Sequence, residues 1–162
     1  ESTFAGDVSE RALLEATALT HAEAVAKRLR REGLRARTVV LKLKLAQRRR
    51  PGARGFDLVT RRATLPTATD DGEVLYREAR RLLERAALAE PVRLLGVGVT
   101  GLEPYAARQS GLFDEPVADA RRDRLNRALD AVAERFGAGS VVRAGAAPAQ
   151  RAGLSLQIKR GE

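Results

Sequence analysis

Cysteine is absent from this 162-residue sequence, and histidine occurs once, as His21. Without cysteine the chain can form no disulfide and no thiolate metal site, and a single histidine cannot build a zinc site. No run of about 18 apolar residues is present that could cross a membrane, and the acidic, polar N-terminal residues lack the pattern of a secretory signal. We therefore expect a protein that is not attached to a membrane, holds no metal and works in the cytoplasm.

The side chains that could support catalysis are also few. One histidine would have to serve any Ser/His/Asp arrangement, and its place beside an apolar stripe favours a packing role. Asp70 and Asp71 are adjacent carboxylates, but they stand where a helix is predicted to begin, so we interpret them as helix caps. The sequence predicts a binding protein with no catalytic residue, no metal ligand and no cofactor.

Positive charge is concentrated in one part of the chain. The whole sequence has a net charge of +9, from 30 basic and 21 acidic residues. Residues 27–62 contain 14 basic residues and only two acidic ones, Glu32 and Asp57, so this segment alone has a net charge of +12. Such a concentrated positive field attracts a polyanion. On charge alone, an RNA- or ribosome-binding protein remains an alternative to a DNA-binding one.

Two amphipathic helices are predicted from apolar residues at three-to-four-residue spacing. The first spans 11–31, after a segment with capping-box spacing from Asp7 to Glu10, and Gly33 is its expected stop. The second opens at 70–73, again with capping-box spacing, and ends before Pro91. The stripes consist of Leu14, Ala18, Ala22, Val25 and Leu29 in the first helix and Val74, Leu75, Ala79, Leu82, Leu83 and Ala86 in the second.

Strands are predicted between and after these helices. Residues 38–45 alternate, with leucines at 41, 43 and 45 on one face and Lys42 and Lys44 on the other. A hairpin loop at 47–55 leads into a second strand over 56–65, which Pro66 is expected to end. A further strand is predicted over 92–99. A β-bulge could change which of the adjacent arginines at 61 and 62 faces outward, so the sequence leaves that open.

With Ser2-Thr3-Phe4 as the end of an initial strand, the order becomes βαββαβ. This order predicts an α+β fold in which two helices cover one face of a four-stranded antiparallel sheet and leave the other face open. We expect one domain over 1–102, a linker over 103–116, and a helix with a partly flexible tail over 117–162. The tail helix has an apolar side made of Leu125, Leu129, Val132 and Phe136.

The open face is the predicted binding surface. Lys42, Lys44, Arg61 and Arg62 would contact phosphates, and Thr38, Thr60 and Thr64 would add neutral hydrogen bonds. Aromatic residues make up only 4% of the sequence, which argues against stacking on unpaired bases. The pattern favours binding to the backbone of duplex DNA. An interaction module that dimerises through the tail helix is a third alternative.

The linker contains a separate short motif, Gln109-Ser110-Gly111-Leu112-Phe113. An exposed Leu-Phe pair is a candidate anchor for another protein, since large apolar side chains often dominate interfaces. Equally, Leu112 and Phe113 could pack against the start of the helix that follows. The residues themselves do not decide between these two interpretations.

Four segments in this order resemble the little-finger domain of Y-family DNA polymerases, most closely the polymerase IV type. They are AVAKRLR at 24–30, GLRARTVVLKLK at 33–44, TRRATLP at 60–66 and RLLGVGVTGL at 93–102, together with Phe4. The resemblance implies a sheet whose open face holds primer–template duplex. It extends the DNA-binding role to Arg37, Thr38, Lys42, Lys44, Thr60, Arg61, Arg62 and Thr64.

In this family the parent protein is a DNA-directed DNA polymerase, a nucleotidyltransferase of translesion synthesis and DNA repair. The resemblance places its catalytic carboxylates and magnesium in a palm domain that these residues do not include. Polymerase IV proteins also carry a peptide that binds the ring-shaped sliding clamp, and Gln109, Leu112 and Phe113 match it, whereas Ser110 and Gly111 depart from it. The implied partners of a monomeric chain are therefore duplex DNA and the sliding clamp.

Overall fold

The computed structural model describes residues 1–49, 55–105, 116–137, 139–146 and 149. The elements in chain order are β1 (Ser2–Val8), α1 (Arg11–Arg31), β2 (Leu34–Arg48), β3 (Phe56–Thr69), α2 (Gly72–Arg85), β4 (Val92–Pro104), α3 (Pro116–Phe136) and a short 3-10 helix (Ala144–Ala146).

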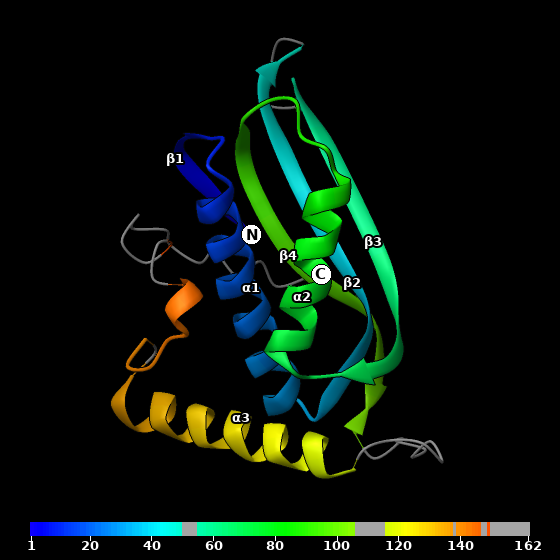
Figure 1. Ribbon diagram of the computed structural model, residues 1–162, viewed down its shortest axis with the longest axis vertical. Helices are drawn as coiled ribbons and strands as arrows, with labels where there is room; N and C mark the ends of the chain where they lie inside the picture. The colour runs from blue at the N-terminus through cyan, green and yellow to red at the C-terminus, as the bar shows by residue number, and fades with distance from the viewer. Residues whose placement is uncertain (50–54, 106–115, 138, 147–148, 150–162) are drawn as a thin grey trace.

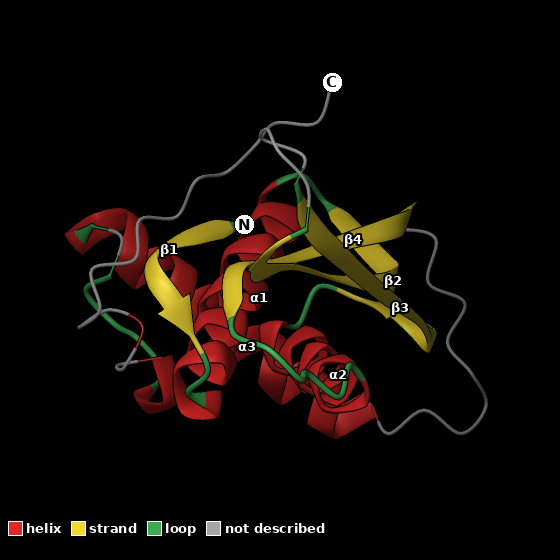
Figure 2. Cartoon of the chain, turned by 90° about the horizontal axis from the view of Figure 1, so that it is seen from above, coloured by secondary structure: helices red, strands yellow, loops and turns green. Residues whose placement is uncertain are grey.

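The four strands form one antiparallel sheet in the order β1-β4-β2-β3. Helices α1 and α2 lie side by side on one face of it (Figure 1), and none of the helices that the structure describes lies across the other face (Figure 2). The predicted βαββαβ order and α+β class are confirmed. In the described residues, no helix is long and apolar enough to span a membrane.

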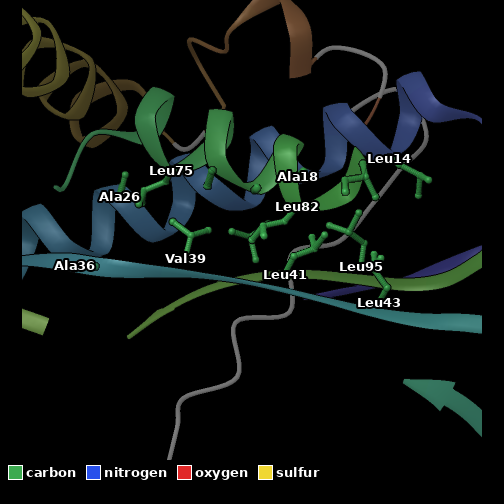
Figure 3. Packing of buried hydrophobic residues seen from close by; sticks show 14 of the residues in the cluster. Leu14, Ala18, Ala26, Ala36, Val39, Leu41, Leu43, Leu75, Leu82 and Leu95 are labelled. Atoms are coloured by element: carbon green, nitrogen blue, oxygen red, sulfur yellow. The ribbon is translucent and has the colours of Figure 1, made fainter. Parts of the chain in front are cut away.

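The core lies between this sheet and the two helices (Figure 3). Leu41 and Leu43 of β2 and Leu95 of β4 are completely buried beneath the helices. The helices contribute small residues to this core, namely Ala18, Ala22 and Ala26 of α1 and Ala79 of α2, all completely buried. The predicted apolar faces of both helices are therefore the faces that pack.

Helix α1 begins at Arg11 as predicted, but the prediction of a capping box at its start is wrong. Strand β1 continues to Val8, so the Asp7 carboxylate belongs to the strand and lies 3.6 Å from an Arg93 nitrogen. Glu10 is the N-cap residue, and its side chain makes no capping hydrogen bond. The predicted stop is confirmed, because Gly33 has φ +64, a left-handed conformation that costs glycine least.

Helix α2 has the predicted carboxylate cap, supplied by the second of the two aspartates. Asp71 Oδ1 accepts a hydrogen bond of 2.8 Å from the backbone N–H of Glu73. Asp70 instead turns toward Arg35, with 3.7 Å between Oδ1 and Nε. The two adjacent carboxylates thus have different structural roles.

Strand β3 runs through Pro66 to Thr69, so the prediction that Pro66 ends it is wrong. The strand lies at the edge of the sheet. Proline is tolerated there because its missing N–H can face solvent instead of a neighbouring strand. Its pairing shifts from Thr38↔Thr64 to Ala36↔Thr69, so a bulge of β3 contains the proline. Strands β2 and β4 also extend beyond their predicted ends, to Arg48 and Pro104.

Helix α3 packs on the domain through charged groups. Arg30 of α1 donates from Nε and Nη2 to the two carboxylate oxygens of Asp130, at 2.6 and 2.8 Å. The Tyr105 hydroxyl donates to Asp123 at 3.2 Å, and the ring of Tyr105 lies 4.1 Å from the guanidinium of Arg35. The predicted apolar side of α3 faces the domain only in part. Leu129 lines a cavity with Thr17 and His21 of α1, whereas Leu125 and Phe136 are 52% and 67% exposed.

Candidate nucleic-acid interface

The pairing register decides which side chains share the open face. Residues directly opposite each other in an antiparallel pair point to the same side of the sheet. Leu41 and Leu43 are buried under the helices, so Lys42 and Lys44 between them point to the open face. The rows on the open face are Thr38–Thr64–Thr100, Val40–Arg62–Gly98, Lys42–Thr60–Gly96 and Lys44–Leu58–Leu94.

The register separates the two adjacent arginines of β3. Arg62 pairs with Val40 and therefore lies on the open face. Arg61 pairs with the buried Leu41 and so belongs to the side that carries the helices. It is nevertheless exposed, because β3 is the edge strand, and its Nη1 donates to the Thr60 carbonyl at 3.2 Å. Arg61 was predicted to lie on the open face, and the structure does not place it there.

Arg37 lies at the far end of the sheet, beside the bulge of β3. Its Nη2 donates to the Pro66 carbonyl at 3.1 Å, and its Nη1 lies 3.8 Å from a carboxylate oxygen of Glu103. The side chain is exposed. Arg37 therefore lies at the margin of the open face and contacts residues of both β3 and β4.

A row of three hydroxyl groups crosses the open face. The Oγ1 atoms of Thr38 and Thr64 are 3.4 Å apart, and Thr100 of β4 continues the row. Thr100 was not predicted as a site residue. Counting in steps of two along β4 from the glycines at 96 and 98 would have placed it on this face. Hydroxyl groups donate to phosphate oxygens without distinguishing one base from another.

The inner strand β4 has glycine, and therefore no side chain, at two positions of the open face. A Cβ added at Gly98 would meet no atom within 4 Å, so the space in front of this backbone is open. At Gly96 the corresponding space is occupied by Glu1, and a Cβ added to this glycine would lie 2.8 Å from the Cβ of Glu1. Glycines in a strand allow another molecule to approach the backbone closely. The open face therefore combines cationic side chains with a backbone that is accessible at Gly98.

The one histidine of the chain is not part of the open face. His21 lies in α1 with only 3% of its surface exposed, and burial lowers its pKa to about 4, so it is neutral at pH 7. Within the described ranges, no group of three or more His, Cys, Asp or Glu residues is placed to hold a metal ion. The predicted clamp-binding residues Gln109, Leu112 and Phe113 lie outside the described residues.

The sequence of this chain is similar to those of known proteins. A family model described as "impB/mucB/samB family C-terminal domain" matches residues 1–112. The DNA polymerase IV of Desulfatibacillum aliphaticivorans is 43% identical over 121 residues, which cover 74% of this chain and 28% of the relative. That of Methanoculleus marisnigri is 38% identical over 112 residues, covering 69% and 29%.

A third relative, the DNA polymerase IV of Caulobacter vibrioides, is 33% identical over 144 residues, covering 88% of this chain and 33% of the relative. In each case the match spans only about a third of the relative or less. The family match covers more than half of the chain and the whole four-stranded sheet. The chain therefore belongs to the impB/mucB/samB C-terminal domain family, as a little-finger domain of the Y-family DNA polymerases.

Proposed function

We propose that this chain holds primer–template duplex DNA on the open face of its sheet, without regard to base sequence, as part of a translesion DNA polymerase IV. The observation that carries the proposal is the composition of that face. Lys42, Lys44 and Arg62 project from β2 and β3 beside a row of threonines, next to strand β4, which bears two glycines. The opposite face is covered by helices and cannot serve.

These side chains match the needs of a polymerase that moves along its substrate. Lysine and arginine bind phosphates and release counterions, which gives affinity for any sequence and a steep dependence on salt. Threonine hydroxyls and backbone N–H groups add hydrogen bonds to phosphate oxygens. None of these contacts reads a base edge, so the duplex can advance by one base pair without loss of binding.

The chemical step of the parent polymerase belongs to another part of the longer protein. Nucleotidyl transfer in such an enzyme needs magnesium held by carboxylates. The described residues contain no cluster of acidic groups that fits a metal ion. The contribution of this chain is therefore to position the duplex beside a catalytic core.

Charge reversal on the open face tests the proposal. Lys42→Glu with Lys44→Glu should weaken binding of fluorescently labelled duplexes at least about tenfold, equally for unrelated sequences, and reduce the salt dependence by about two phosphate contacts. Arg77→Glu with Arg81→Glu on α2 is the matched control, because it changes the net charge equally on the helical side. A loss confined to particular sequences would contradict phosphate contact.

The competing RNA-binding interpretation has a direct test with the same labelled duplex. Structured RNA and unlabelled duplex DNA are added as competitors at equal nucleotide concentration. We expect duplex DNA to compete at least as well as RNA, because the open face offers backbone contacts to a B-form duplex. Displacement by RNA at much lower concentrations would favour an RNA-binding function instead.

We further propose that Gln109, Leu112 and Phe113 recruit the polymerase to the sliding clamp. The support is the sequence motif, a glutamine followed by a Leu-Phe pair. Leu112→Ala with Phe113→Ala should abolish binding to the purified clamp and leave duplex binding and thermal unfolding unchanged. Leu125→Ala on the exposed side of α3 is the control. Loss of folding in the double variant would show that the pair packs within the chain.

A further inference from the structure

Three side chains from three strands meet at the hairpin end of the open face. The Phe56 ring of β3 has Lys44 Nζ of β2 at 4.9 Å from its centroid and the Arg93 guanidinium carbon of β4 at 5.1 Å. Phe56 lies two residues before Leu58, which pairs with Lys44, so the ring belongs to the open face. One aromatic ring thus contacts two cations.

A β-bulge brings Arg93 to this place. Strand β2 pairs Lys44 with Leu94 and then Leu45 with Val92, so Arg93 is an extra residue on β4. Val92 remains completely buried in the core. The bulged arginine is half exposed and reaches the same ring that Lys44 contacts. Without the bulge, Arg93 would alternate with Leu94 and point to the helical side.

We propose that Lys44 and Arg93 form a binding site for one phosphodiester of a nucleic acid backbone, with Phe56 as its positioning residue. The assignment rests on the proposed function and names a contact within it. Two like charges repel and would separate on an unsupported surface. The negative face of an aromatic ring attracts cations, so Phe56 limits the movement of both side chains and holds each of them about 5 Å from its centroid.

The charges around the site leave room for an anion. Asp7 lies 3.6 Å from Arg93 and is the one carboxylate within 4 Å of either cation among the described residues. Two positive charges and one negative charge leave a net charge of about +1, which a phosphodiester would neutralise. Leu58, 59% exposed in the same row as Lys44, adds an apolar surface that a deoxyribose could cover.

Duplex binding at several salt concentrations tests the site with the full chain. Arg93→Gln should weaken binding about three- to tenfold and lower the salt slope by about one contact. Phe56→Leu removes no charge and keeps an apolar side chain, yet it should weaken binding about threefold. Phe56→Tyr keeps an aromatic ring and should bind duplex with wild-type affinity. Arg77→Gln on α2 is the charge-matched control and should have little effect.

A triple variant, in which Phe56→Leu is added to Arg93→Gln and Lys44→Gln, separates positioning from a general loss of structure. If Phe56 acts through Arg93 and Lys44, Phe56→Leu should add little to the loss already caused by Arg93→Gln and Lys44→Gln together. Thermal unfolding of each variant should match the wild type. Wild-type affinity in Phe56→Leu, or a full additional loss in the combined variant, would overturn the proposal.

A second measurement distinguishes failure of this site from failure of the proposed function. Inorganic phosphate is titrated into the wild-type chain while NMR follows the Arg93 Nε–H and the Phe56 ring protons. Shifts at both groups in the wild type, with a smaller shift of the Arg93 Nε–H in Phe56→Leu, support the site even if the chain binds no duplex. Strong duplex binding without such shifts, and without any effect of Arg93→Gln, would refute the site and leave the function intact.

Discussion

Lys42 Nζ lies 3.1 Å from Oε2 of Glu1, so a central cation of the open face is paired with a carboxylate of the same chain. Glu1 also lies directly over Gly96. A phosphate that contacts Lys42 therefore competes with this carboxylate for the ammonium group. Since Lys42 is partly exposed, the ion pair is weak and exchange with a phosphate is feasible.

Replacing Glu1 should strengthen duplex binding. Glu1→Gln frees Lys42 and removes a negative charge from the open face, so we expect affinity to rise about two- to fivefold at low salt. Glu84→Gln, on the helical side, changes the net charge equally and should have a much smaller effect. Equal gains in both variants would mean that only net charge matters and that the ion pair with Lys42 does not compete with DNA.

The two neighbouring arginines of β3 should behave differently. Arg62→Gln removes a cation from the open face and should weaken duplex binding about three- to tenfold, with a loss of about one contact from the salt slope. Arg61→Gln should have little effect, because the register places Arg61 opposite the buried Leu41. Titrations of both variants with one labelled duplex make the comparison. A larger effect of Arg61→Gln would contradict this register.

His21 should make the stability of the fold depend on pH. Burial lowers its pKa in the folded chain from 6.5 to about 4, so the unfolded chain takes up a proton first as the pH falls. The stability contribution is complete above pH 6.5 and is lost as the pH falls toward about 4, by up to about 3 kcal/mol.

Urea unfolding of the wild type and of His21→Gln at several pH values checks this expectation. The free energy of unfolding of the variant should fall less between pH 6.5 and 4, because carboxylates then supply the remaining pH dependence. Direct NMR titration of His21 in the wild type is the second measurement. A His21 pKa near 6.5 in the folded chain would rule out the effect.

The ion pair between Arg30 and Asp130 should control the attachment of α3. Asp130→Asn weakens a bidentate, charge-assisted pair, and we expect α3 to open more easily by about 1–3 kcal/mol. Amide hydrogen exchange should then become faster in α3 and stay unchanged in β2 and β4. Glu134→Gln on the same helix is the control. Faster exchange throughout the sheet would show that α3 is an integral part of the core.

The sequence was sufficient for the order of the elements and for the main cations of the open face. Helical and strand periods differ, and a period of two places Lys42 and Lys44 opposite Leu41 and Leu43 whatever the neighbouring strands do. Gly33 as the stop of α1 followed from the same local reasoning, since glycine tolerates a positive φ. These features depend on the backbone of one element and on its nearest neighbours in the chain.

Only the tertiary structure decided the features that depend on pairing between distant segments. The register of β3 on β2 placed Arg62 and not Arg61 on the open face, and the edge position of β3 allowed Pro66 inside a strand. The bulge at Arg93 brought together residues 44, 56 and 93, and Asp130 met Arg30 across 100 positions of sequence. Bulges, edges and long-range ion pairs result from how strands and helices fit together in space, and no local period encodes them.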